Sequence, residues 1–179
     1  MGKEAYEITG TVDRALMVDQ IRKAARQFAM QYFHFCKTLY ERYGHDTAKD
    51  IVRQTVYELA VDRSDQIRAK SLAAGRKADN VDDFMTDIDL PFQGWIPEWG
   101  EDHCPYAEVW RTYFDQYPWF REFAPFYCDV IDTTTIENYS KCLSHRITQN
   151  VILEGDKCTR EYFASEAVKE GKYTYGEKA

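Results

Sequence analysis

Residues 143–163 constrain the fold most, because they carry the pattern of a β-hairpin. Apolar and polar positions alternate with a period close to two over residues 143–153. A Gly-centred turn follows at residues 154–157, and residues 158–163 are typical of a returning strand. Upstream, Asp132 is predicted to be the N-cap of a short helix over residues 133–141. We therefore expect a helix that leads into an antiparallel hairpin turning near Gly155.

The N-terminal half predicts long helices. Apolar residues recur every three or four positions from Val18 to Leu39 and again from Ile51 to Leu59, so two helices should pack through these stripes. Gly44 is predicted to end the first helix and Asp46 to cap the second. A third helix is expected over residues 78–87, with Asn80 as its N-cap. The acidic residues nearby are interpreted as a solvated face rather than a metal site: Asp79, Asp82, Asp83, Asp87 and Asp89.

Helices followed by a hairpin predict the α+β class. The expected architecture is an N-terminal bundle of long helices packed on a small antiparallel sheet that contains the C-terminal β-hairpin. Because a lone hairpin is marginally stable, we expect a further strand from residues 88–96, from residues 127–131 or from another chain. Residues 1–12 are predicted to be an arm, residues 13–165 one domain, and residues 166–179 a polar tail.

Composition narrows the partners of this chain. A net charge of −7 argues against nucleic acid, and no apolar run is long enough to span a membrane. The N-terminal residues lack the apolar core of a signal peptide, and the five cysteines are odd in number and unevenly spaced. These features predict free thiols and a cytoplasmic location. We expect a small-molecule substrate, no nucleic acid and no membrane, and the pattern leaves homo-oligomerisation open.

No generic catalytic motif is present, so the candidate site rests on a constellation around the hairpin. The alternation places His145 on the side of its strand that is expected to face inward, where it is either a general base or a hydrogen-bonded structural group. Cys128 is either a nucleophile or a buried inert thiol. Asp132 is either a helix cap or a proton acceptor. The expected register places Cys158 about 25 Å along the strand from His145, so we interpret it as structural.

Residues 90–103 form a loop rich in Pro, Gly and Trp, which either roofs a pocket or plugs the core with Trp95 and Trp99. No cofactor is predicted. A divalent-metal site is kept as the alternative, built from residues of the metal-ligating types: His103, Cys104, Cys128, Cys142 and His145.

Three short pieces carry a family resemblance. They are CPYAEVW at residues 104–110, Tyr127-Cys128-Asp129 followed by Asp132, and LEGDKC at residues 153–158. In this order and spacing they resemble the L-2-amino-thiazoline-4-carboxylic acid hydrolase family over residues 100–163. The resemblance implies a hydrolase-like α+β domain. It also implies the opening of a cyclic amidine or thiazoline-type ring by addition of water at C2, which gives an N-carbamoyl amino acid.

That reaction needs a base, an acid and groups that hold the substrate. Asp132 and His145 are the expected base and acid in either order, and Cys128 is the alternative, attacking directly. Arg146 or Arg160 would hold a substrate carboxylate. The remaining predicted binding residues are Trp95, Trp99 and Glu108. The competing hypothesis is a non-catalytic small-molecule binding or sensor domain, related to 4-vinyl reductase-like modules.

Overall fold

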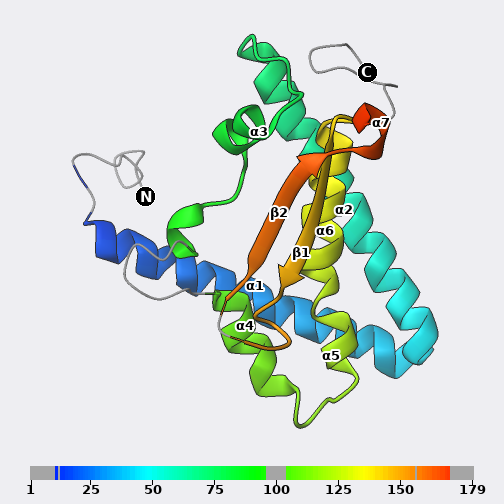
Figure 1. Cartoon of the computed structure of the whole chain (residues 1–179). Coiled ribbons are helices and arrows are strands. Elements are labelled where there is room, and N and C mark those ends of the chain that lie inside the picture. Colours follow the sequence, from blue (N-terminus) through cyan, green and yellow to red (C-terminus); the bar gives the residue numbers. More distant parts are fainter. Residues whose placement is uncertain (1–10, 12, 96–103, 156, 170–179) are drawn as a thin grey trace, which may run out of the picture.

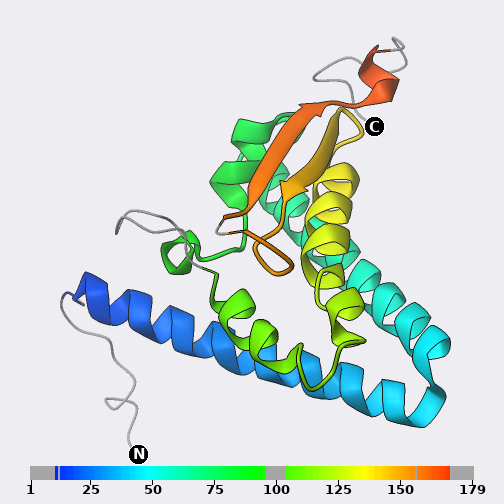
Figure 2. The ribbon, with the colours of Figure 1, turned by 60° about the horizontal axis from the view of Figure 1, so that its bottom comes forward.

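The computed structural model describes residue 11 and residues 13–95, 104–155 and 157–169. Helices predominate, and the strands form one two-stranded antiparallel sheet, so the predicted α+β class is confirmed. The hairpin lies over the helix at residues 126–139, and the two long N-terminal helices diverge from the turn that joins them (Figures 1 and 2). No further strand occurs in this part of the chain: residues 127–131 are helical and residues 88–95 lack strand structure.

The two long helices are α1 (Arg14–Tyr43) and α2 (His45–Ala73), joined at Gly44 with a φ of 77°. This positive φ suits glycine, and it lets α2 begin directly after the turn, so Asp46 is not the N-cap that the sequence predicted. The predicted contact between the two helices is present, but it is not the most extensive contact of either. Instead of packing mainly on one another, α1 packs chiefly on α4 (Pro105–Trp110) and α2 on α6 (Phe126–Tyr139).

The buried face of α2 agrees with the predicted stripe in part: Val52 and Val56 of that stripe are buried, whereas Ile51 and Leu59 are exposed. The face toward α6 carries four small or β-branched residues. These are Ala48, Val52, Val56 and Ala60, spaced by four residues. Small side chains at this spacing allow a close approach of two helices. On α1, Phe35 is likewise exposed, and Phe33 is buried in its place.

Helix α6 begins seven residues before the predicted helix, at Phe126 after Pro125 rather than at Thr133. Asp132 therefore lies in the middle of the helix and caps nothing.

The predicted cap of α3 (Val81–Asp87) is confirmed, because the side chain of Asn80 accepts a hydrogen bond from the amide of Asp83 at 2.9 Å. The nearby acidic run is not simply a solvated face: Asp79 and Asp87 are buried.

The hairpin pairs β1 (Leu143–Gln149) with β2 (Thr159–Ala164), and His145 lies opposite Tyr162. The ladder is irregular between Ile147 and Gln149, and β1 ends four residues sooner than predicted. Residues 150–155 leave the sheet and form a compact turn that includes Gly155 at a φ of 73°. The distance argument that set Cys158 apart from the site is thus wrong, because its register was wrong.

The core is unusually aromatic and is divided into two clusters. The larger one surrounds three fully buried rings, Trp110 of α4 and both Phe120 and Phe123 of α5 (Phe120–Phe123). The indole of Trp110 donates to the carbonyl of Ala29 at 2.8 Å. The smaller cluster contains Phe84 and residues of α6 and β1. Short elements complete the fold: η2 (Phe92–Gly94), η4 (Arg111–Tyr113) and α7 (Glu166–Lys169), the last of which falls in the predicted tail.

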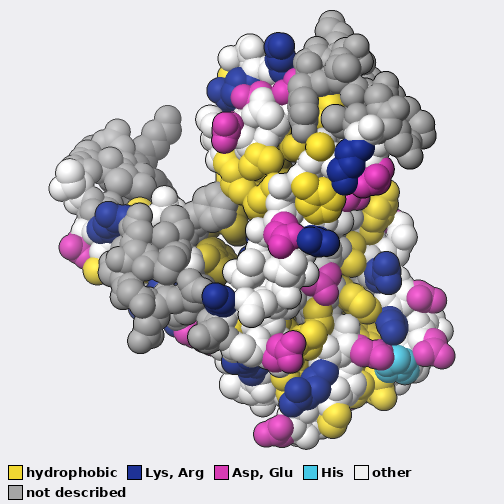
Figure 3. Space-filling view, in the orientation of Figure 1, with side chains coloured by type: hydrophobic (Ala, Val, Ile, Leu, Met, Phe, Trp, Pro, Cys, Tyr) yellow, Lys and Arg dark blue, Asp and Glu magenta, His cyan; other side chains and the backbone are white. Residues whose placement is uncertain are grey.

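Acidic and basic side chains are interspersed over the face in Figure 3, in keeping with the several ion pairs of the surface. None of the described helices combines the length and apolar character needed to cross a membrane.

Candidate active site

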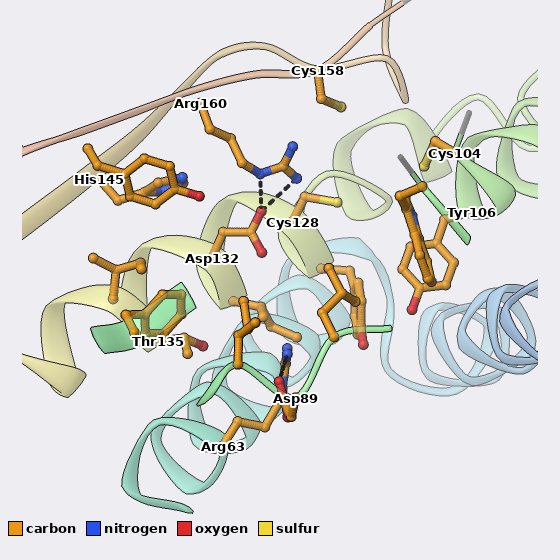
Figure 4. Close-up of a pocket in the computed structure, with 18 of the residues that line it drawn as sticks. Arg63, Asp89, Cys104, Tyr106, Cys128, Asp132, Thr135, His145, Cys158 and Arg160 are labelled. Atoms are coloured by element: carbon orange, nitrogen blue, oxygen red, sulfur yellow. Dashed lines mark hydrogen bonds and ion pairs between the residues drawn. The ribbon is translucent and has the colours of Figure 1, made fainter. Parts of the chain in front are cut away.

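A cavity of about 500 Å³ lies where the two core clusters meet, beneath the hairpin. Its walls come from α2, from the segment after α3, from the start of α4, from α6 and from β1 and β2. In Figure 4, His145 lies at one end and Cys104 with Tyr106 at the other, and Cys128 and Asp132 lie between them. Three of the predicted site residues, Cys128, Asp132 and His145, therefore line one cavity.

Helix α6 supplies one wall. Cys128, Asp132 and Thr135 are separated by four and three residues, which places them on a single helical face. The hairpin supplies the facing wall. Because directly paired residues of an antiparallel ladder project to the same side, His145 and its partner Tyr162 share this wall with Arg160. The continuous helix through residues 126–139 is what brings Cys128 and Asp132 into register with the hairpin.

Asp132 and Arg160 form an ion pair across the cavity. Oδ2 of Asp132 accepts from Nε of Arg160 at 2.8 Å and lies 2.7 Å from Nη2. Burial opposes the charge of Arg160, but the adjacent carboxylate outweighs burial, so the pKa of Arg160 is raised. Oδ1 of Asp132 and Nη1 of Arg160 form no hydrogen bond with the described residues. Each side chain thus keeps one polar atom for a ligand.

His145 is 4% exposed, and its Nδ1 lies 3.2 Å from the hydroxyl of Thr133. Its Nε2 is buried and has no hydrogen-bond partner among the described residues. Burial lowers the pKa of His145, and Arg160 also lowers it, against the opposing effect of Asp132. The imidazole is therefore neutral near pH 7. Neutral imidazole with one nitrogen held by Thr133 has the other nitrogen available as a proton acceptor or donor.

The thiols of Cys128 and Cys104 are protonated at rest. Burial, then the charge of Asp132, raises the pKa of Cys128 well above its usual value, and burial raises that of Cys104. The sulfur of Cys104 also accepts from the amide of Ala107 at 3.4 Å, at the N-terminus of α4. Cys158 lines the cavity as well and accepts from the amide of Val151 at 3.4 Å. All five cysteines are free thiols in the structure.

A second ion pair lines the cavity, and the sequence analysis missed it. Arg63 of α2 contacts both carboxylate oxygens of Asp89, with Nε to Oδ2 at 2.8 Å and Nη2 to Oδ1 at 2.5 Å. The hydrogen bonds from Arg63 hold the pKa of Asp89 below its usual value. The two residues belong to different elements and form no local motif, so no sequence signal joins them. With Lys157, three cationic side chains and two carboxylates line the cavity, although the chain is acidic.

Of the other predicted binding residues, Trp95 lies in the cavity wall, whereas Arg146 and Glu108 lie outside it. Trp95 lines the cavity, with its ring 5.3 Å from that of Tyr106. Arg146 is exposed on the opposite side of the hairpin and pairs with Glu161, and Glu108 is exposed and pairs with Arg26. Neither Arg146 nor Glu108 is part of the cavity wall.

Two further predictions, for Trp99 and for His103, fall outside the described residues. Among the residues that the structure does describe, no three His, Cys, Asp or Glu side chains are grouped so as to hold a metal ion. Comparison of the chain with protein-family models, with curated proteins and with solved structures found no match. The family resemblance of residues 100–163 therefore stays a prediction.

The cavity combines a neutral imidazole, a carboxylate, a guanidinium and protonated thiols within aromatic walls. These groups can bind a small molecule that carries both a carboxylate and a basic nitrogen, and they can move a proton at it.

Proposed function

We propose that this protein is a small-molecule hydrolase that opens a cyclic amidine or thiazoline-type ring by adding water at C2. The observation that carries the proposal is the position of His145. Its Nε2 is buried and has no hydrogen-bond partner among the described residues, and His145 lines a cavity that also contains the Asp132–Arg160 pair. A buried nitrogen without a partner is costly in a folded protein, so such a group supports a site in which a substrate or water completes the hydrogen bond.

The free polar atoms of the ion pair suit the two ends of a 2-aminothiazoline-4-carboxylate. Nη1 of Arg160 would donate to the substrate carboxylate, and Oδ1 of Asp132 would accept from an N–H of the amidine group. The excess of one positive charge among the described lining residues favours a ligand that bears an anionic group.

In the proposed reaction, the Nε2 atom of His145 takes a proton from water as the water oxygen bonds to C2 of the ring. The tetrahedral intermediate collapses to a C2=O bond as the C2–S bond breaks: the departing sulfur receives the proton held by His145, and the hydroxyl proton of the intermediate passes to the ring nitrogen. One water molecule is consumed and an N-carbamoyl amino acid is formed. This route needs His145 neutral, which its lowered pKa favours, and Nδ1–H donating to the hydroxyl of Thr133.

Direct attack by Cys128 is less well supported. Its thiol is buried and its pKa is raised, so the nucleophilic thiolate is scarce near neutral pH. The carboxylate of Asp132 also raises the pKa of Cys128, because it disfavours a second negative charge nearby.

A non-catalytic binding domain is the second candidate. The observation that favours it is that Asp132 is already paired with Arg160, while Trp95, Tyr106 and Tyr127 line one end of the cavity. In such a domain these polar groups would only hold the ligand.

Turnover of 2-aminothiazoline-4-carboxylate, followed by mass spectrometry of the carbamoyl product, tests the proposal. His145→Gln and Asp132→Asn should each lower kcat by about a hundredfold or more, as expected for loss of a general base or a substrate contact. Cys128→Ala should retain turnover. Arg146→Gln, which removes an exposed arginine of the same hairpin, is the matched control and should be fully active.

Calorimetry on the same proteins separates the two candidates. Binding without turnover by the wild-type protein would favour the binding domain. Loss of turnover in Cys128→Ala alone would make the thiol the nucleophile and contradict the role given to His145.

A further inference from the structure

The cavity is larger than the ring substrate needs. A 2-aminothiazoline-4-carboxylate has about nine non-hydrogen atoms, which fill at most about 270 Å³ if each takes the volume of a liquid water molecule. The cavity measures about 500 Å³. A ring between His145 and the Asp132–Arg160 pair would leave part of this volume over, toward the end where Cys104 and Tyr106 lie (Figure 4).

That other end, which we call the aromatic end, is lined by Trp95, Cys104, Tyr106, Tyr127 and Cys158. Its rings meet edge to face: the centroids of Trp95 and Tyr106 lie 5.3 Å apart with planes at 69°, and those of Tyr106 and Tyr127 lie 5.2 Å apart with planes at 87°. Rings in this arrangement expose both faces and edges to a further planar group.

Three groups of the aromatic end are also uncharged. Burial raises the pKa of Cys104, Tyr106 and Tyr127, so the thiol and both phenols stay protonated near neutral pH. Thiols are soft and polarisable, and they pack well against aromatic rings. The end of the cavity remote from His145 therefore has the character of an apolar binding surface, in contrast to the ionic centre.

We infer that the substrate carries a planar apolar substituent, which binds at the aromatic end while the ring lies between His145 and the Asp132–Arg160 pair. This inference rests on the proposed function for the placement of the ring. It extends that function by naming the substrate class: an aryl-substituted cyclic amidine or thiazoline carboxylate rather than the unsubstituted ring.

Calorimetric affinities for two probes test the inference. They are 2-aminothiazoline-4-carboxylate and its 5-phenyl derivative, and the protein is the His145→Gln variant, so that hydrolysis does not interfere. The phenyl compound should bind at least tenfold more tightly, because the aromatic end removes the phenyl group from water. Equal or weaker binding of the phenyl compound would overturn the inference.

A variant that fills the aromatic end gives a second test. In a His145→Gln background, Cys158→Phe should abolish the preference, bringing the ratio of the two affinities close to one. Leu153→Phe adds a ring at an exposed residue of the turn that precedes Cys158 and should keep the tenfold preference. A preference that survives Cys158→Phe, in protein with an unchanged circular dichroism spectrum, would contradict the assignment. If that variant does not fold, the comparison of probes on the parent protein decides.

The two proposals fail separately. Tight binding of the phenyl probe without hydrolysis by the wild-type protein would support the aromatic end and refute ring opening. Hydrolysis of the unsubstituted ring without any gain from the phenyl group would support ring opening and refute the aromatic end.

Discussion

The Asp132–Arg160 ion pair is the interaction whose strength the structure defines best, and a double-mutant cycle would measure it. Both contacts are shorter than 3 Å and converge on one carboxylate oxygen, and the side chains are 29% and 32% exposed. The perturbations are Asp132→Asn, Arg160→Gln and the two combined. Each single change leaves the other partner in the cavity wall without its counter-charge.

The expected coupling lies between two limits. Two unit charges about 4 Å apart attract by about 4 kcal/mol at an effective dielectric constant of 20, before desolvation is subtracted. Fully exposed pairs contribute about 0.2–1 kcal/mol, and breaking a fully buried pair costs about 3–5 kcal/mol. Because these side chains are nearly a third exposed, solvent screens the attraction in part. We therefore expect a coupling free energy of about 1–2 kcal/mol.

Urea denaturation of the four proteins, at low salt and at 1 M NaCl, gives this coupling directly. The matched control is the Arg146–Glu161 pair, which is 65% and 46% exposed and has an equally short contact of 2.5 Å. Its coupling should stay below about 0.5 kcal/mol and vanish in high salt. A coupling of Asp132 with Arg160 as small as that of the control would refute the reasoning, since the two groups would then be separated by solvent.

Three other perturbations follow from the same structure. Phe120→Ala should lower the free energy of unfolding in urea by about 3–5 kcal/mol, because this ring is fully buried in the aromatic cluster; a loss under 1 kcal/mol would contradict that burial. Asn80→Ala should cost about 1 kcal/mol through loss of the cap of α3, and Asn80→Ser should cost less. Burial lowers the pKa of His145, so its contribution to stability is present above the unfolded-state value of about 6.5 and is lost as the pH falls through the folded-state pKa. As the pH falls from 7 to 5, the denaturation midpoint should fall more steeply for wild type than for His145→Gln. Parallel slopes would show that the pKa of His145 is not lowered in the folded protein.

The sequence predicted the elements of the fold better than their contacts. Helical periodicity identified α1 and α2, and alternation identified the hairpin, since both signals are local. The start of α6 was missed because Asp132 is a residue type that often caps helices, and its sequence neighbours alone do not show that it lies in the middle of one. The spacing of Cys128, Ile131 and Thr135, all buried, contained the helical signal, with Pro125 before it.

The predicted catalytic residues that line the cavity lie close to one another in sequence. Cys128, Asp132 and His145 come from adjacent elements, and their convergence followed from the order of helix and hairpin. Arg63 and Asp89 were missed because tertiary packing alone brings them to the cavity. Cys158 was set aside because the sequence shows no signal for the irregularity that ends β1 at Gln149 and shortens the ladder.

The walls of the cavity belong to segments distributed from α2 to β2, and its two ion pairs join residues 26 and 28 positions apart in the chain. No single helix or strand retains the complete set, so a ligand of this cavity binds the folded arrangement of these segments and not the unfolded chain. Thermodynamic linkage then requires the ligand to stabilise the whole molecule against unfolding rather than one region of it. At a free concentration a hundred times its Kd, the gain is about 2.7 kcal/mol. A rise in the melting temperature of the whole protein consequently reports compounds that occupy this cavity, whether or not they react there.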